Sequence, residues 1–377
     1  MDKNESFIKH LKLVPDFRAE RRKRHKLIDI LFIALCTILS GGEGFSDMVV
    51  FATRREDWLR KYIELPRGIP GYHTFRRVFR ILDPNTLNEG LRSWAESLQS
   101  MTSGQVIALD GKTLRHSFDT WSGQKSLHLL NAWVTELGLA LGCEKVDSKS
   151  NEIPSAPDLI EKLSIEGHTV TLDAMGCQKD TAIKIVDKGG DYLLCVKGNQ
   201  PGLYEDLKEF FDDCGDFKGM EYDYFESLEK GHGRIEERKC WAVEGEARWL
   251  GIDKDWEKVR TIAKISRKRT VRGKSSVETS YYITSLAGNA KNIASVARSH
   301  WRVENSLHWV LDVTMNEDMN RARKDRSPEN LAVLRRIAVS MVNQIKGKMS
   351  VRSCLKSAGW DTSFLEQILI GHRQVST

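Results

Sequence analysis

Two stretches with the same pattern, each a short β-favouring run that ends in an aspartate, constrain the fold of this chain more than any other feature. Residues 106–109 are followed by Asp110, and residues 169–172 are followed by Asp173. Each run predicts a buried strand that delivers its carboxylate at the carboxyl end. Two carboxylates held together repel each other unless a cation joins them, and Mg²⁺ or Mn²⁺ suits such oxygen ligands. The alternative interpretation is that each aspartate merely caps the turn after its strand.

The order of elements after residue 105 favours one arrangement of the sheet. A strand ending at Asp110 precedes an antiparallel hairpin, and helices then alternate with strands. The hairpin is expected at 127–134 and 139–146, the later strands at 168–174 and 191–197, and the helices at 153–163, 179–187 and 200–211. If the fourth strand lies parallel to the first, Asp110 and Asp173 become neighbours at the switch point of the sheet. This is a ribonuclease-H-like layout. A doubly wound nucleotide-binding fold is the alternative, but residues 110–113 lack its glycine-rich and Walker patterns.

Helical segments are expected on both sides of this core, with a β-rich insertion at about 215–290. Residues 1–100 are expected to form a helical, DNA-binding domain with helices at 27–39, 45–62 and 73–82, and residues 101–377 the catalytic domain, which is helical again from residue 292. A basic run at 18–26 could be a solvated face or could lie along a phosphate backbone. The arginines of 73–82 and a basic loop at 267–274 in the insertion leave the same two alternatives.

Composition is consistent with a protein that meets a polyanion. The 377 residues carry a net charge of +6, and the seven cysteines show no metal-ligand spacing. The longest apolar run, 27–39, is interrupted by Asp29 and is too short to span a bilayer. We expect a cytoplasmic protein with free thiols and no membrane partner.

A third carboxylate candidate lies on a predicted helix. His300, Glu304 and His308 recur every four residues and share one helix face. Glu304 could complete a site for two metal ions, of the kind that processes phosphodiesters, or could simply pair with its two histidines. A zinc hydrolase site is disfavoured, because histidines eight residues apart are separated by about 12 Å along a helix.

Six ordered motifs occupy residues 108–115, 149–153, 170–178, 196–200, 231–236 and 300–309, and two further matches lie near the N-terminus at 15–18 and 74–77. Together these motifs closely resemble the ISAs-type insertion-sequence transposases, a group that includes the H-repeat-associated proteins of Rhs elements. The likeness covers nearly the whole chain.

The resemblance implies a DDE transposase with a ribonuclease-H-like core and a β-insertion between the second Asp and the Glu. It implies that Asp110, Asp173 and Glu304 are catalytic and bind two Mg²⁺ (or Mn²⁺) ions per active site. The implied reaction is nicking at element ends followed by 3′-hydroxyl strand transfer. The partners would be double-stranded element ends and target DNA, with a homodimer when two ends are synapsed at the nucleoid.

The expected DNA contacts come from basic side chains near these motifs. They are Arg21, Arg22, Arg24, Lys112, Arg234, His300, Arg302 and His308. The chain departs from the Y-x-x-R-x-x-x-E-x-x-x-x-x-x-K signature of related transposases, because Ala297, His300 and Leu311 occupy the Tyr, Arg and Lys places. His300, Arg298 or Arg302 could supply the phosphate contact.

Two other functions remain open at this point. One is a catalytically silent DNA-binding remnant of an insertion element, although all three carboxylates are present. The other is a metal-dependent phosphatase of small substrates, which leaves the basic helical N-terminal domain unexplained.

Overall fold

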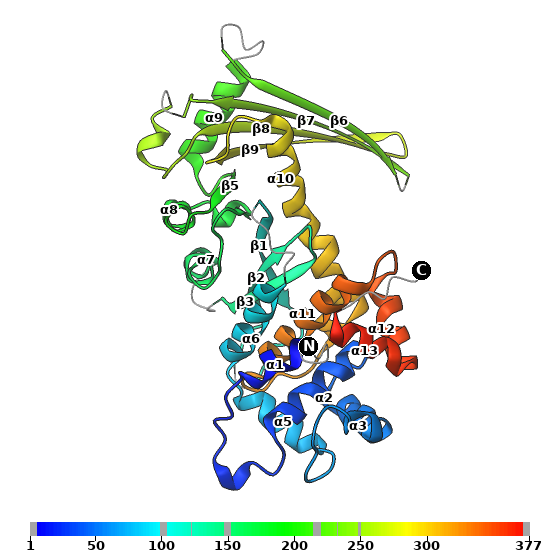
Figure 1. Cartoon of the computed structure of the whole chain (residues 1–377). Helices are drawn as coiled ribbons and strands as arrows, with labels where there is room; N and C mark the ends of the chain where they lie inside the picture. Colours follow the sequence, from blue (N-terminus) through cyan, green and yellow to red (C-terminus); the bar gives the residue numbers. More distant parts are fainter. Residues whose placement is uncertain are drawn as a thin grey trace. The chain divides into compact units, whose positions relative to one another are not determined.

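The computed structural model describes residues 6–98, 104–121, 123–146, 152–213, 220–231, 233–247 and 250–371. The chain divides into two compact units, which are described separately. The helical unit comprises 1–101, 111–148 and 303–377, and the strand-rich unit comprises 102–110 and 149–302. Figure 1 shows the whole chain and labels most of its helices and strands.

The described residues contain one mixed sheet of nine strands in the order β3-β2-β1-β4-β5-β9-β8-β7-β6. The strands are β1 (Val106–Leu114), β2 (Leu127–Val134), β3 (Leu139–Lys145), β4 (Thr169–Leu172), β5 (Asp191–Val196), β6 (Asp223–Gly231), β7 (Arg234–Glu244), β8 (Thr261–Val271) and β9 (Lys274–Thr284). An antiparallel β2–β3 hairpin and the parallel pairs β1–β4 and β4–β5 give the first five strands the ribonuclease-H-like order. The predicted fold class is confirmed.

In the strand-rich unit, the insertion extends the same sheet. Strand β9 pairs antiparallel with β5, and β8, β7 and β6 follow in turn. The helix α10 (Ala290–Val303) packs its apolar side, with Ile293 and Val296, on the face formed by these strands. The other helices of this unit are α7 (Glu152–Glu161), α8 (Lys179–Asp187) and α9 (Pro201–Asp213).

The expectation of a basic loop at 267–274 was wrong. Residues up to Val271 belong to β8, Lys274 begins β9, and only Arg272 and Gly273, both with positive φ, form the turn. Opposite charges across the ladder stabilise this hairpin, because Arg267 lies opposite Glu278 and its guanidinium is 2.7 Å from that carboxylate.

The helical unit is built around two long apolar helices. Helix α2 (Leu27–Leu39) has the predicted bounds and is almost wholly buried. Helix α11 (Ser327–Ile345) packs against α2, α5, α6 and β3. The remaining helices are α1 (Ser6–Lys12), α3 (Phe45–Arg54), α4 (Glu56–Leu59), α5 (Tyr72–Ile81), α6 (Pro84–Ser97), α12 (Val351–Trp360) and α13 (Thr362–Ile370). The single helix expected at 45–62 is thus divided between α3 and α4. No helix in the described part of the chain is long and apolar enough to cross a bilayer.

Side chains of two helices cover the outer edge of β3. The amide of Asn88 on α6 donates to the carbonyl of Cys143 (2.9 Å) and accepts from its N–H (3.1 Å). The hydroxyl of Ser340 on α11 accepts from the N–H of Ala140 (2.9 Å). These bonds satisfy backbone groups that an edge strand would otherwise leave unpaired.

Candidate active site

The first two predicted carboxylates lie at one edge of the sheet in the strand-rich unit. The parallel register of β1 and β4 runs up to the pair Leu109 and Leu172, so Asp110 and Asp173 each follow a paired residue. Both aspartates are half-buried. The expected parallel pairing of these strands is confirmed, although β1 does not end at Asp110 and continues to Leu114.

Asp173 also caps the turn that follows its strand. Its Oδ1 accepts from the backbone N–H groups of Met175 (3.0 Å) and Gly176 (3.3 Å). Gly176 is required here, because a Cβ at this position would lie 2.4 Å from Leu172 Cδ2. The alternative prediction, that this aspartate caps the turn after its strand, is therefore confirmed for Asp173. It is compatible with metal binding, since a carboxylate has four acceptor positions on two oxygens.

Two amide side chains stabilise the loop that carries Asp173. Asn199 donates to the carbonyl of Ala174 (2.5 Å), and Gln200 donates to the carbonyl of Cys177 (3.0 Å). Both belong to the 196–200 motif, to which the sequence assigned no role. The available signal was the position of two amide residues directly after the β5 run.

The helix α10 lies beside the strand that leads to Asp173. The Nδ1 of His300 is 3.1 Å from the hydroxyl of Thr171, the third of the four residues of β4. This contact orients His300 towards the sheet. Glu304 follows His300 by four residues in the chain, directly after the end of α10.

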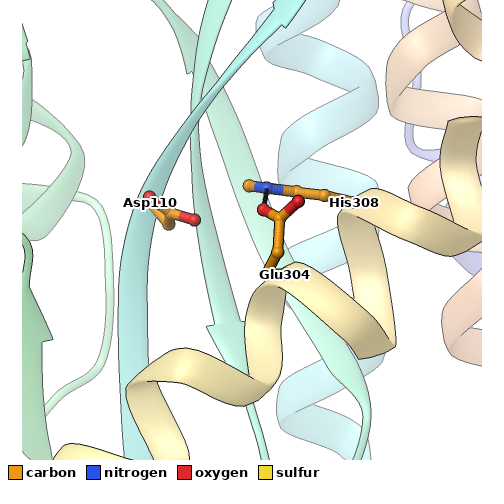
Figure 2. Close-up of side chains that lie close together, drawn as sticks. All are labelled: Asp110, Glu304 and His308. Atoms are coloured by element: carbon orange, nitrogen blue, oxygen red, sulfur yellow. Dashed lines mark hydrogen bonds and ion pairs between the residues drawn. The ribbon is translucent and has the colours of Figure 1, made fainter. Parts of the chain in front are cut away.

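In the helical unit, Glu304 and His308 form a pair, which Figure 2 shows. The Oε2 of Glu304 is 3.1 Å from the Nδ1 of His308, and Glu304 is exposed whereas His308 is buried. The predicted pairing of Glu304 with a histidine therefore holds for His308. The π-helical segment Glu304–His308 carries both residues, and a second π-helical segment, Val310–Thr314, follows it. Turns of this kind are frequent at functional sites.

His308 is neutral at physiological pH. Burial is the main cause that lowers its pKa, and the positive charges of Arg336 and Lys112 act in the same direction. The neighbouring Glu304 carboxylate acts in the opposite direction, and the net effect is a pKa of about 4. A neutral imidazole can donate one hydrogen bond and offer one lone pair, so it can orient a carboxylate or bind a metal.

Lys112 belongs to a buried charge cluster behind this pair. Its ammonium lies 2.6 Å from Asp312 and 3.5 Å from Asp318, with the buried Glu317 at 4.0 Å. Burial raises the pKa of Asp312, and the Lys112 ammonium partly opposes this. These contacts make Lys112 a structural residue of the helical unit, and its expected DNA contact stays a prediction that they do not favour.

A second part of this buried charge cluster, centred on Arg336, was not predicted from the sequence. The fully buried Arg336 donates to Glu317 (2.9 Å) and to the side chain of Asn131 (2.6 Å). An arginine on an apolar helix gives no sequence signal that its partner is a buried carboxylate.

The other predicted DNA contacts fall into both units. Arg21 and Arg24 are exposed in the helical unit, and the side chain of Arg22 lies outside the described residues. Arg302 and Arg234 are exposed in the strand-rich unit, where Arg234 is 3.2 Å from Glu236. The alternative phosphate contact, Arg298, forms a double ion pair with Glu229.

Comparison with known proteins identifies the family. Residues 8–95 match the family described as DDE_Tnp_1-associated, and residues 102–341 match the transposase DDE domain. The chain belongs to the transposase DDE domain family. This confirms the family that the sequence motifs indicated.

Several relatives match this chain over nearly its whole length. "Putative transposase YncI" of Escherichia coli O157:H7 is 34% identical over 97% of this chain and 94% of its own length. "H repeat-associated putative transposase YhhI" of Escherichia coli strain K12 is 35% identical over 97% of each chain. Among solved structures, the piggyBac transposase synaptic complex with hairpin DNA is 12% identical with a TM-score of 0.42, covering 96% of this chain and 79% of that one.

Proposed function

We propose that this protein is an active DDE transposase that nicks DNA at the ends of an insertion element and joins the freed 3′-hydroxyl to target DNA. The observation that carries the proposal is that Asp110 and Asp173 each directly follow the last paired residue of two neighbouring parallel strands, in a chain of this family. Glu304 is proposed as the third catalytic carboxylate.

The donor set suits hard divalent cations. Asp110, Asp173 and Glu304 offer carboxylate oxygens, the ligands that Mg²⁺ and Mn²⁺ prefer. Within the helical unit, Glu304 lies 3.1 Å from the buried His308, and such a carboxylate–imidazole pair further supports a metal role for Glu304. When bound, a pair of such ions supplies activation of the attacking hydroxyl and stabilisation of the leaving oxygen.

The residues around the proposed carboxylates position them. The turn at 174–176 fixes Oδ1 of Asp173, which leaves the carboxylate in one orientation. The neutral His308 donates its Nδ1–H to Glu304 and so restrains a side chain that is otherwise exposed. Restrained ligands reduce the cost of assembling the site around a phosphodiester.

We propose that residues 1–100 bind DNA and that residues 101–377 form the catalytic domain with its insertion. The exposed cations Arg21, Arg24, Arg234 and Arg302 are suited to phosphate contacts. Joining two element ends requires two active sites, so a homodimer is expected on DNA. The place of action is then the nucleoid.

The test uses a labelled duplex that carries the flanking element end, with Mg²⁺ or Mn²⁺. The wild type, Asp110→Asn and Glu304→Gln are compared with Glu89→Gln, a control at an exposed glutamate of α6. Nicking or strand transfer that is lost in the first two variants, with DNA binding kept, supports the proposal.

Two other outcomes contradict it. Binding without cleavage by the wild type in either metal indicates a silent remnant of an insertion element. Absence of DNA binding, together with metal-dependent hydrolysis of small phosphate esters, indicates a phosphatase.

A further inference from the structure

A hollow of about 480 Å³ opens in the helical unit. Its walls are the beginnings of three helices: residues 44–46 before and within α3, Tyr72 of α5, and Ser327 of α11. The segment 320–324 completes it. Helix amino-terminal ends favour anions, because their N–H groups and dipoles point outward.

Four cations line this hollow. Arg76 and Arg321 are exposed, and no carboxylate partner is recorded for either among the described residues. Arg323 is held in place by the carbonyl of His116 (3.0 Å), and Lys324 pairs with Asp119 (2.6 Å). With Asp119 as the lining carboxylate already paired, the two exposed guanidiniums leave the hollow strongly positive.

A buried hydroxyl gives an independent indication of a ligand. Ser327 lines the hollow, its side chain is 2% exposed, and its Oγ has no hydrogen-bond partner within the described part of the chain. A buried hydroxyl without a partner is unfavourable, so such groups are usually satisfied by another molecule.

The walls of the hollow are tied together. The fully buried Asn330 of α11 donates to the carbonyls of Phe79 and Leu82 at the end of α5. An ion pair of 2.5 Å joins Arg80 of α5 to Asp325. Arg76, one turn earlier on α5, is thereby held beside the 320–324 segment.

We propose that this hollow binds a backbone phosphate of duplex DNA, through Arg76, Arg321 and Ser327. The inference rests on the proposed function and adds a contact that joins the N-terminal helices to the segment after Glu304. The hollow is larger than one phosphate needs. The half-exposed ring of Tyr72 meets the ring of Phe45 edge-on, with their centroids 6.3 Å apart, and supplies an apolar wall for a deoxyribose. Phosphate contacts of this kind fix the register of a protein on DNA without reading its sequence.

The test measures DNA binding without cleavage, by fluorescence anisotropy of the element-end duplex in EDTA at several salt concentrations. Arg76→Ala and Arg321→Ala should each reduce the slope of log K against log salt by about one, and the double variant by about two. Arg352→Ala, at an exposed arginine of α12, is the matched control and should keep the wild-type slope. Ser327→Ala should keep the melting temperature and weaken binding about tenfold.

A second arm identifies the phosphate. Single neutral methylphosphonates are placed in turn along the duplex. The wild type should lose affinity at one position at which the double variant loses none. If no such position exists, or if the double variant keeps the wild-type slope, the inference is overturned while DNA binding by the wild type leaves the proposed function standing. If the wild type binds no duplex, the proposed function itself fails.

Discussion

The ammonium of Lys112 lies 2.6 Å from Oδ1 of Asp312, inside the helical unit and two residues after Asp110 in the chain. The Lys112 side chain is 5% exposed, and Glu317, fully buried, lies 4.0 Å from the same ammonium. The cation therefore neutralises carboxylates that have little water around them.

Replacing Lys112 by methionine should lower the free energy of unfolding by about 3 kcal/mol, because it leaves buried carboxylates without their cation. This loss is near the low end of the range for removing one partner of a buried ion pair, because the side chain of Asp312 is one-third exposed to solvent. Urea unfolding followed by circular dichroism measures the change. Arg115→Ala, at an 80% exposed side chain near Asp318, is the control and should cost less than about 1 kcal/mol. Equal stability of Lys112→Met and the wild type would contradict the role given to this pair.

The two functions of Asp173 can be separated by two substitutions. Asparagine keeps an oxygen that accepts from Met175 and Gly176, whereas alanine removes the cap. We expect both variants to lose DNA nicking, and only Asp173→Ala to lose about 1 kcal/mol of stability. Cleavage assays and thermal unfolding check this. Nicking by Asp173→Asn at the wild-type rate would leave Asp173 only the capping role.

Asn88→Ala should destabilise the chain by about 2 kcal/mol, because it leaves the N–H and carbonyl of Cys143 unpaired at the edge of β3. Chemical denaturation gives the magnitude. Asn85→Ala, three residues earlier on α6 and exposed, serves as the control and should behave like the wild type. A similar loss in both variants would indicate an effect of helix propensity rather than of the strand edge.

Stability should fall as the pH drops below the ordinary histidine pKa of 6.5. Burial lowers the pKa of His168, and burial together with Arg24 and Arg18 lowers that of His25. Between the lowered value and 6.5 the unfolded chain binds more protons than the folded one, so stability present above 6.5 is lost on acidification. Each histidine contributes at most about 1.4 kcal/mol per pH unit. His168→Gln should flatten the profile and His73→Gln, at an exposed residue, should not. An unchanged profile in His168→Gln would contradict this assignment.

The parts of the fold that the sequence predicted are those with a strong local signal. The apolar run 27–39 gave α2 with its bounds, because a helix buried all round is apolar all round. The two runs before Asp110 and Asp173 gave the parallel strands on which the proposed site depends. Asp110 and Asp173 could be chosen as candidate metal ligands because a charged side chain directly after a buried apolar strand is unfavourable unless it has a partner.

The rest depends on partners that lie far apart in the sequence. Nothing near Lys112 indicates that its partner is Asp312, and nothing near Thr171 indicates His300. The basic residues 267–269 resemble a solvated loop in the sequence alone, because Glu278, which lies opposite Arg267, is supplied by the separate strand β9. The π-helical turn at Glu304 could not be predicted either, because the four-residue spacing of His300, Glu304 and His308 fits an ordinary α-helix equally well.

The helical unit is built from three separate stretches of the chain, and this determines where the protein can be split into two polypeptides. Most of helix α11 falls within the DDE-domain match, which ends at residue 341, yet the helix packs on α2, α5 and α6 from the region of the associated N-terminal match. A gene cut between residues 101 and 102 would yield two polypeptides that each expose apolar surface meant for the other. Expressed separately they should aggregate, and expressed together they should reassemble by fragment complementation.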